Sequence, residues 1–231
     1  MDTWTTTSSP TQAAERVSAF LWKVYAWMCI GLGLTAVVAY TVSGSPALVR
    51  ALVGNPIGLI VVVAAELGLV WFISARAAQL APATAAGLFS LYSALNGVTL
   101  SVVLLVYTGE SIATTFLVTA GMFGALALWG VTTKRDLTGM GQFMFMGLIG
   151  LVLASIVGIF WHSDALQFLI TVVGVIVFTG LTAYDAQRLR QMALALPSGE
   201  VGGYAIVGAL TLYLDFINLF IMLLRLIGRR D

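Results

Sequence analysis

Seven long apolar segments constrain this chain more than any other feature of its sequence. Each is close to the about 20 apolar residues that a helix needs to cross the hydrocarbon core of a bilayer. The segments are residues 19–43, 56–75, 83–107, 112–132, 138–160, 165–187 and 204–227. Only 9% of the residues are charged, whereas a soluble domain carries about 25%. The sequence therefore predicts an all-α integral membrane protein with seven transmembrane helices in a lipid bilayer.

The residues between the apolar segments support these boundaries. Every proline falls in a loop or in a first helical turn, where its missing N–H is harmless. Short loops at residues 107–111 and 161–166 favour antiparallel neighbours, so we expect the first six helices to pair as three hairpins. Residues 1–18 are polar and lack the features of a secretory signal. We therefore expect a disordered or surface-bound N-terminal arm, 1–18, followed by one transmembrane domain, 19–231.

The distribution of Lys and Arg predicts the orientation. Basic residues gather at alternate ends of the helices, at Arg16, Lys23, Arg76, Lys134, Arg135, Arg188 and Arg190. This pattern places the N-terminus in the cytoplasm. A second basic group at Arg225, Arg229 and Arg230 departs from it, because a complete seventh crossing puts these residues outside. The last segment either crosses completely or enters the membrane and returns. We favour a complete crossing, since no proline or glycine pair interrupts residues 205–227.

Asp215 lies at the midpoint of the last apolar segment. A charge at the bilayer centre costs about 2.5–3.5 kcal/mol on insertion scales, and polar atoms there must face protein or water. At about 100° per residue, one helical face collects Tyr204, Gly208, Thr211, Asp215, Asn218 and Met222. We therefore expect this helix to lie among the other six, with Thr211 and Asn218 as accessory polar groups.

Two further acids lie in predicted membrane helices. Asp185 is near the cytoplasmic end of the sixth segment, where it either pairs with Arg188 on the same helix or faces an acid on another helix. Glu66 lies midway through the second segment and is protonated, paired or functional. Arg76 is ten residues further along that segment, about 15 Å of helix away, so direct pairing of Glu66 with Arg76 within the helix is excluded.

A pair of carboxylates on different helices has a distinctive chemistry. Two such groups within a few Å cannot both ionise cheaply, so they titrate as one unit and sense protons. When ionised, their oxygens suit Ca²⁺. We therefore expect Asp185 and Asp215 to form a proton sensor and to offer a Ca²⁺ site.

Two stretches of sequence point to a known family. Residues 213–228, YLDFINLFIMLLRLIG, and residues 178–190, FTGLTAYDAQRLR, closely resemble the signature regions of the Bax inhibitor-1 family, also called the transmembrane Bax inhibitor motif family. Residues 66–97 and 132–141 resemble its bacterial branch.

This resemblance implies a fold and a function. It implies three hairpins around a central C-terminal helix, and a pH-sensitive calcium leak whose proton sensor is formed by Asp185 and Asp215. It also implies that Arg76, near the cytoplasmic end of the second span, acts as a latch. Some bacterial members instead bind and restrain a membrane-anchored AAA protease.

Two functions therefore stand at this point. The first is a pH-sensitive calcium (cation) leak channel, with Ca²⁺ and protons as its ions. The second is an interaction protein that modulates a membrane-anchored AAA protease, or a stress or cell-death pathway, without ion flux.

Other functional classes are not expected. His162 is the only histidine and lies in a loop, which removes His-dependent serine or metal hydrolysis within the membrane. We expect no enzyme, no permanent cofactor and, without a basic patch, no nucleic-acid partner. A preference for Arg over Lys and abundant Ala favour a bacterial inner membrane.

Overall fold

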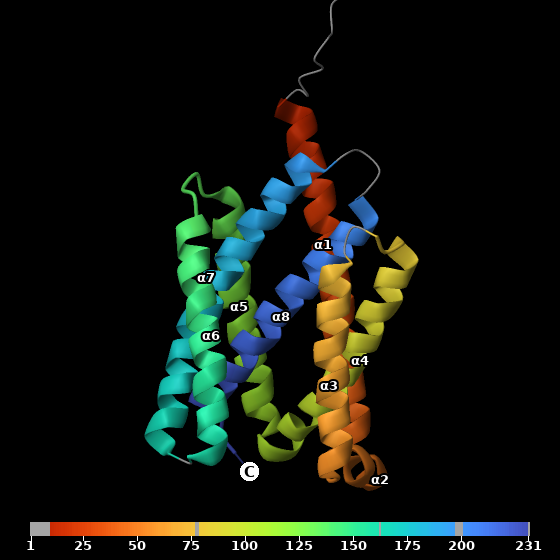
Figure 1. Cartoon of the computed structure of the whole chain (residues 1–231), viewed down its shortest axis with the longest axis vertical. Helices are drawn as coiled ribbons and strands as arrows, with labels where there is room; N and C mark the ends of the chain where they lie inside the picture. Colours follow the sequence, from red (N-terminus) through yellow and green to blue (C-terminus); the bar gives the residue numbers. More distant parts are fainter. Residues whose placement is uncertain (1–9, 77–78, 162, 197–200, 231) are drawn as a thin grey trace, which may run out of the picture.

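Seven membrane-length helices make up most of the computed structural model, which describes residues 10–76, 79–161, 163–196 and 201–230. Their bounds are α1 (Pro10–Ser43), α3 (Pro56–Ala75), α4 (Pro82–Val106), α5 (Gly109–Thr132), α6 (Thr138–Phe160), α7 (Asp164–Ala195) and α8 (Val201–Ile227). A helical turn, α2 (Pro46–Leu48), and a single π-type turn, η1 (Val49–Val53), connect α1 to α3. The described residues form no β-strand. The prediction of an all-α integral membrane protein is confirmed (Figure 1).

Local side chains fix where several of these helices begin. The Asn55 side chain accepts a hydrogen bond from the N–H of Ile57, and Pro56 occupies the first turn of α3. Thr108 and Ser163 cap α5 and α7 in the same way. Such caps satisfy backbone donors that the helix itself leaves free.

Two helices extend well beyond the predicted membrane segments. α1 begins at Pro10, so the second half of the expected polar arm is helical, while residues 1–9 lie outside the described part of the chain. α7 continues to Ala195, eight residues past the predicted end at residue 187. Both extensions are rich in Ala, Gln, Glu, Arg or Leu, which are strong helix formers. Residues with high helix propensity therefore extend both helices beyond the apolar segments. The predicted loop residues His162 and Pro197 lie outside the described residues.

α8 is the central helix of the bundle. Of the most apolar 18-residue stretch of α8, 72% is buried inside the protein. The corresponding stretch of α6 is only 11% buried, because α6 lies at the periphery. Figure 1 shows α8 running obliquely between α3 and α4 on one side and α5, α6 and α7 on the other. It packs against α1, α4, α5 and α7. The expectation of a central C-terminal helix is therefore confirmed.

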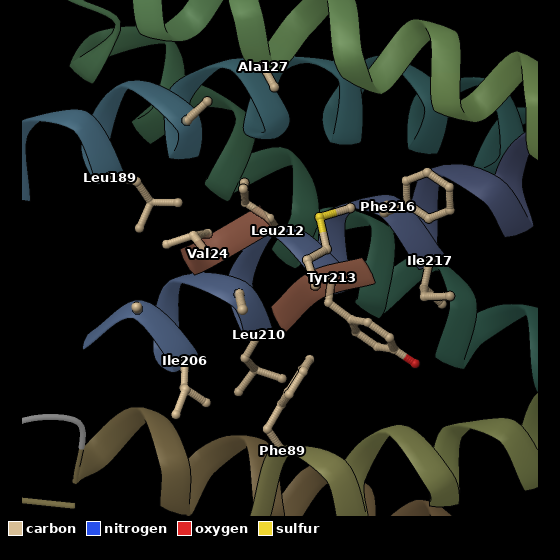
Figure 2. Packing of buried hydrophobic residues seen from close by; sticks show 14 of the residues in the cluster. Val24, Phe89, Ala127, Leu189, Ile206, Leu210, Leu212, Tyr213, Phe216 and Ile217 are labelled. Atoms are coloured by element: carbon tan, nitrogen blue, oxygen red, sulfur yellow. The ribbon is translucent and has the colours of Figure 1, made fainter. Parts of the chain in front are cut away.

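Apolar side chains on several faces of α8 hold it in this position. In Figure 2, Ile206, Leu210 and Tyr213 lie near Phe89 of α4. On another face, Val24 of α1 and Leu189 of α7 meet beside Gly208, where an added Cβ would lie 2.7 Å from Leu189. A helix with no lipid-facing side can carry polar groups in any direction, because protein surrounds it throughout.

The packing of the outer helices differs from the expected three hairpins. α6 and α7 pack along each other as predicted, but α1 packs chiefly against α4, and α3 packs against α4 as well. Gly97 permits the close contact of α1 with α4, since an added Cβ would lie 2.7 Å from the backbone oxygen of Thr35. Short loops make successive helices antiparallel, but the insertion of α8 decides which of them touch.

The C-terminal segment crosses the whole bundle. α8 is unbroken from Val201 to Ile227, and Figure 1 places its end opposite the start of α1. The chain beyond it is tied to the α4–α5 connection: the N–H of Arg229 donates to Ser111 Oγ at 2.9 Å, and the N–H of Thr108 donates to the carbonyl oxygen of Arg229 at 3.2 Å. These features support a complete crossing rather than a segment that enters and returns.

Candidate functional site

Asp215 lies deep in the bundle, at the middle of the central helix α8. Its side chain is 5% exposed, and its Oδ2 atom is buried without a hydrogen-bond partner among the described residues. A carboxyl oxygen without a donor is costly at such a position. Asp215 is therefore a buried acid whose charge the described hydrogen bonds do not offset.

Asp185 faces Asp215 from α7. It is 8% exposed, and its carboxyl group lies close enough to that of Asp215 for the two to interact directly. A hydrogen bond between two carboxyl groups needs a proton on one of them, because two carboxylates offer only acceptors. The structure therefore brings together the two acids that the sequence predicts as a pair.

The alternative for Asp185, an ion pair at a helix end, does not describe its surroundings. α7 continues for ten residues beyond it, and its short-range partner is Asp215. Arg188 is exposed and acts on Asp185 only through its charge.

Arg76, the expected latch, lies apart from this pair. It caps the end of α3, its side chain is exposed, and its guanidinium lies 5.3 Å from the ring centroid of Phe72. The structure places Arg76 against its own helix rather than beside either aspartate.

Glu66 belongs to a second polar cluster, between α3 and α4. The hydroxyl of Thr99 donates to Glu66 Oε1 at 3.0 Å, and Glu66 is close enough to Tyr92 and Tyr213 to act on them electrostatically. The structure gives Glu66 a partner on α4, away from the aspartate pair. This bond is to a neutral hydroxyl, which can pair with a protonated or an ionised carboxyl group, so it does not choose among the three alternatives for Glu66.

Tyr213 is the centre of this second cluster, and sequence reasoning missed its role. Its hydroxyl shares a hydrogen bond of 2.6 Å with Thr35 of α1 and donates to Asn96 Oδ1 of α4 at 3.2 Å. Asn96 Nδ2 in turn donates to the Tyr92 hydroxyl at 3.3 Å. Tyr213 does not lie on the helical face that carries Asp215, so the sequence pattern gave no sign of its partners. They become apparent only because α8 is buried on several sides.

The two accessory residues on the Asp215 face bond to their own helix. Thr211 Oγ1 donates to the carbonyl oxygen of Val207 at 3.2 Å, and Asn218 Nδ2 donates to that of Leu214 at 2.8 Å. Asn218 also lines a hollow of about 810 Å³ together with Arg225 and Ser155. Neither residue contacts the aspartates through these bonds, but both remain half-buried on the same helix.

The carboxyl pair supplies few ligands for a metal ion. Two carboxylates offer four oxygens, whereas Ca²⁺ takes six to eight oxygen ligands. Within the described residues no group of three or more His, Cys, Asp or Glu side chains lies together. The pair therefore supplies too few protein oxygens for a closed Ca²⁺ site.

Comparison with known proteins extends these observations. A family model described as "Inhibitor of apoptosis-promoting Bax1" matches residues 17–231. The inner membrane protein YbhL of Escherichia coli K12 is 49% identical over 233 aligned residues, which cover 100% of both chains. An uncharacterized protein of Borreliella burgdorferi is 45% identical over 91% of this chain and 92% of its own. The protein RP147 of Rickettsia prowazekii is 41% identical over 99% and 97%. The similarity therefore extends over all seven membrane-length helices.

Proposed function

Because this chain belongs to the Bax inhibitor-1 family of membrane proteins, we propose that it is a pH-sensitive calcium (cation) leak channel gated by Asp185 and Asp215. The observation that carries the proposal is the buried contact between these two carboxyl groups at the α7–α8 interface. The named relative from E. coli is an inner membrane protein, and we place this chain in the same membrane of its bacterial host.

The proposed gate works through one proton. While the pair shares a proton, its hydrogen bond holds α7 to α8 and the path stays closed. Loss of that proton leaves two negative charges face to face in a medium of low dielectric constant, where their repulsion is strong. The helices then separate locally, and the ionised oxygens attract a divalent cation. The flux therefore increases as the pH rises through the titration of the pair.

In this proposal, Arg76 acts as a latch only after a conformational change. In the structure its guanidinium lies over Phe72, so a latch role requires α3 to shift and bring the positive charge nearer to the aspartates. An arginine there would stabilise the ionised pair.

The test is Ca²⁺ flux into liposomes that hold the purified protein, measured from about pH 5 to 8, because burial and a neighbouring acid move proton release from a carboxyl group to higher pH. Wild-type flux should rise with pH. Asp185→Asn and Asp215→Asn should each flatten the pH dependence, because asparagine keeps the shape and a hydrogen bond but cannot ionise. Asp136→Asn is the matched control, since Asp136 is an exposed acid outside the membrane helices, and it should leave the profile unchanged.

One result separates the two candidate functions. If flux does not exceed that of empty liposomes at any pH, the aspartates are a structural pair and the interaction-protein alternative gains support. Deletion of residues 2–14 followed by a measurement of AAA-protease restraint in cells then tests that alternative directly. If the leak is real, the Asn variants should alter flux whether or not this deletion has an effect.

A further inference from the structure

An apolar groove separates α1 from α5 on the membrane-facing surface. Both helices pack against α7 and α8, yet they make little contact with each other. We call the hollow between them the α1–α5 groove. It is defined by Tyr25 and Cys29 of α1, Ala120 and Gly124 of α5, and Phe216 of α8 behind them. Its volume is about 500 Å³, within the roughly 300–1,000 Å³ typical of small-molecule sites.

The groove continues to the end of the bundle at which α1 begins and α7 ends. A second hollow of about 730 Å³ shares Leu21, Tyr25 and Val131 with it and reaches Arg190 of α7. This end is the upper one in Figure 1, and it carries the basic residues from which the sequence predicts the cytoplasmic side. The groove is therefore open from the middle of the bundle to the predicted membrane surface.

One basic side chain, Arg190, lines this mouth, and two more lie beside an adjoining hollow. Arg190 also borders a small hollow of about 360 Å³ with Lys134 and Arg135 of the α5–α6 connection. Asp136 is the acid in this hollow, and hydrogen bonds from Thr138 lower its pKa, so it is ionised. The adjoining hollow has three basic side chains against one acid, and Arg190 joins this positive region to the mouth of the apolar groove.

We propose that the α1–α5 groove binds a phospholipid with an anionic headgroup from the predicted cytoplasmic leaflet. The acyl chain lies in the groove, and the headgroup phosphate meets Arg190, with Lys134 and Arg135 beside it. Anionic lipids are attracted to basic residues at this surface. A partner helix could pack on the small residues Ala120 and Gly124 without any basic group nearby. The basic residues at the mouth therefore favour an anionic lipid as the occupant.

The bound chain would touch the helix that carries the carboxyl pair. Phe216 lies at the back of the groove and directly follows Asp215. The lipid site rests on the groove and its charges alone, so it stands whether or not the protein conducts ions.

Native mass spectrometry of the purified full-length protein tests this proposal, with phosphatidylglycerol and phosphatidylcholine titrated separately. Two glycines of α5 provide a matched pair of variants. At Gly124 and at Gly121 an added Cβ meets nothing within 4 Å, but only Gly124 lines the groove. Gly124→Leu fills the groove, whereas Gly121→Leu adds the same side chain elsewhere on the helix.

We expect the wild type and Gly121→Leu to retain phosphatidylglycerol, and Gly124→Leu to lose it. Arg190→Gln should weaken phosphatidylglycerol binding about fivefold, since one basic residue at an anionic surface contributes about 1 kcal/mol and 1.4 kcal/mol corresponds to tenfold. Binding of phosphatidylcholine should be weaker and unaffected by this change. Equal retention of both lipids, or undiminished phosphatidylglycerol binding in Gly124→Leu, would overturn the proposal. A wild-type dimer that Gly124→Leu abolishes would overturn it too, by assigning the groove to a second copy.

The wild-type chain offers an independent readout. Cys29 is the only cysteine, it is exposed, and it lines the groove. Phosphatidylglycerol should slow the alkylation of Cys29 by N-ethylmaleimide in detergent, and Arg190→Gln should shift this protection to higher lipid concentrations. An alkylation rate that phosphatidylglycerol leaves unchanged would contradict binding in this groove.

Discussion

At the scale of single residues, α8 carries two buried polar groups that serve different neighbours. Asp215 faces Asp185 of α7, and Tyr213, two residues earlier, bonds to Thr35 of α1 and Asn96 of α4. Two residues correspond to about 200° of helical rotation, so the two groups point in nearly opposite directions. The same helix is therefore held by a titratable contact on one side and by neutral hydrogen bonds on the other.

Removal of the Tyr213 hydroxyl should destabilise the fold without opening a cavity. Tyr213→Phe keeps the edge contacts with the rings of Phe89 and Tyr92 but loses the bonds to Thr35 and Asn96. Hydrogen bonds between membrane helices contribute about 0.6 kcal/mol on average and up to about 1.7, so we expect a loss of about 1–2 kcal/mol. Thermal unfolding in detergent measures it, with Tyr40→Phe as the exposed control. Equal melting temperatures for the two variants would contradict this role.

Glu66 should not set the midpoint of the pH response. Its hydrogen bond is to Thr99 of α4, whereas the aspartate pair lies between α7 and α8. In the liposome assay, Glu66→Gln should change the overall flux less than either aspartate variant and leave the pH midpoint in place. A midpoint that moves with Glu66→Gln as it does with Asp185→Asn would join the two polar clusters into one sensor.

At the scale of whole helices, small residues set how closely neighbouring helices approach. Gly130 of α5 lies directly against the backbone carbonyl of Ala183 in α7, only two residues before Asp185. Gly121, on the same helix, has open space around it. The close approach of α5 to α7 therefore depends on one glycine and helps to position the helix that carries Asp185.

Replacement by alanine should change the stability of the protein differently at Gly130 and at Gly121. Gly130→Ala forces α5 away from α7, and overpacking of this kind costs about 1–3 kcal/mol. Gly121→Ala meets no neighbour, and alanine is the better helix former by up to about 1 kcal/mol, so stability should be unchanged or higher. Thermal unfolding of the two variants in one detergent provides the comparison. A Gly130→Ala variant as stable as the wild type would mean that α5 and α7 have room to adjust.

At the scale of the whole molecule, one helix inside a ring of others sets the architecture. Large apolar side chains such as Trp71, Phe160 and Tyr40 are exposed on the outer helices, where a bilayer would cover them. α8 crosses the interior and ends opposite the start of α1. Because lipid gives no hydrophobic drive for helix association, close packing and internal hydrogen bonds must hold α8 in place.

The two ends of the chain should lie on opposite sides of the membrane. The positive residues near the helix ends predict a cytoplasmic N-terminus, and the seventh crossing then places the C-terminus outside the cytoplasm. A green fluorescent protein fused to the N-terminus should fluoresce, and an alkaline phosphatase fused to the C-terminus should be active. The reciprocal fusions are the controls. A fluorescent C-terminal fusion with an inactive phosphatase would show that the last segment returns or that the orientation is reversed.

The sequence alone was sufficient for the fold class and the seven helices, whereas it left Asp185 with two alternatives until the family resemblance pointed to Asp215. Long apolar runs have few other stable forms, since backbone groups in lipid must be satisfied within a helix or barrel, and a buried acid requires a partner. Where hydropathy was the only guide, it set the start of α1 too late and the end of α7 too early, because these helices continue on propensity beyond the apolar residues.

The tertiary structure decided which side chains meet. Sequence reasoning could not place Tyr213 beside Thr35 and Asn96, assign Glu66 to Thr99, or set Arg76 over Phe72. It also predicted hairpin contacts of α1 with α3 and of α4 with α5. Instead, α1 packs chiefly on α4, and α5 packs chiefly on α7. The reason is physical: the pattern along a helix fixes only which residues share its faces, and the neighbour of each face depends on where the other helices pack around α8.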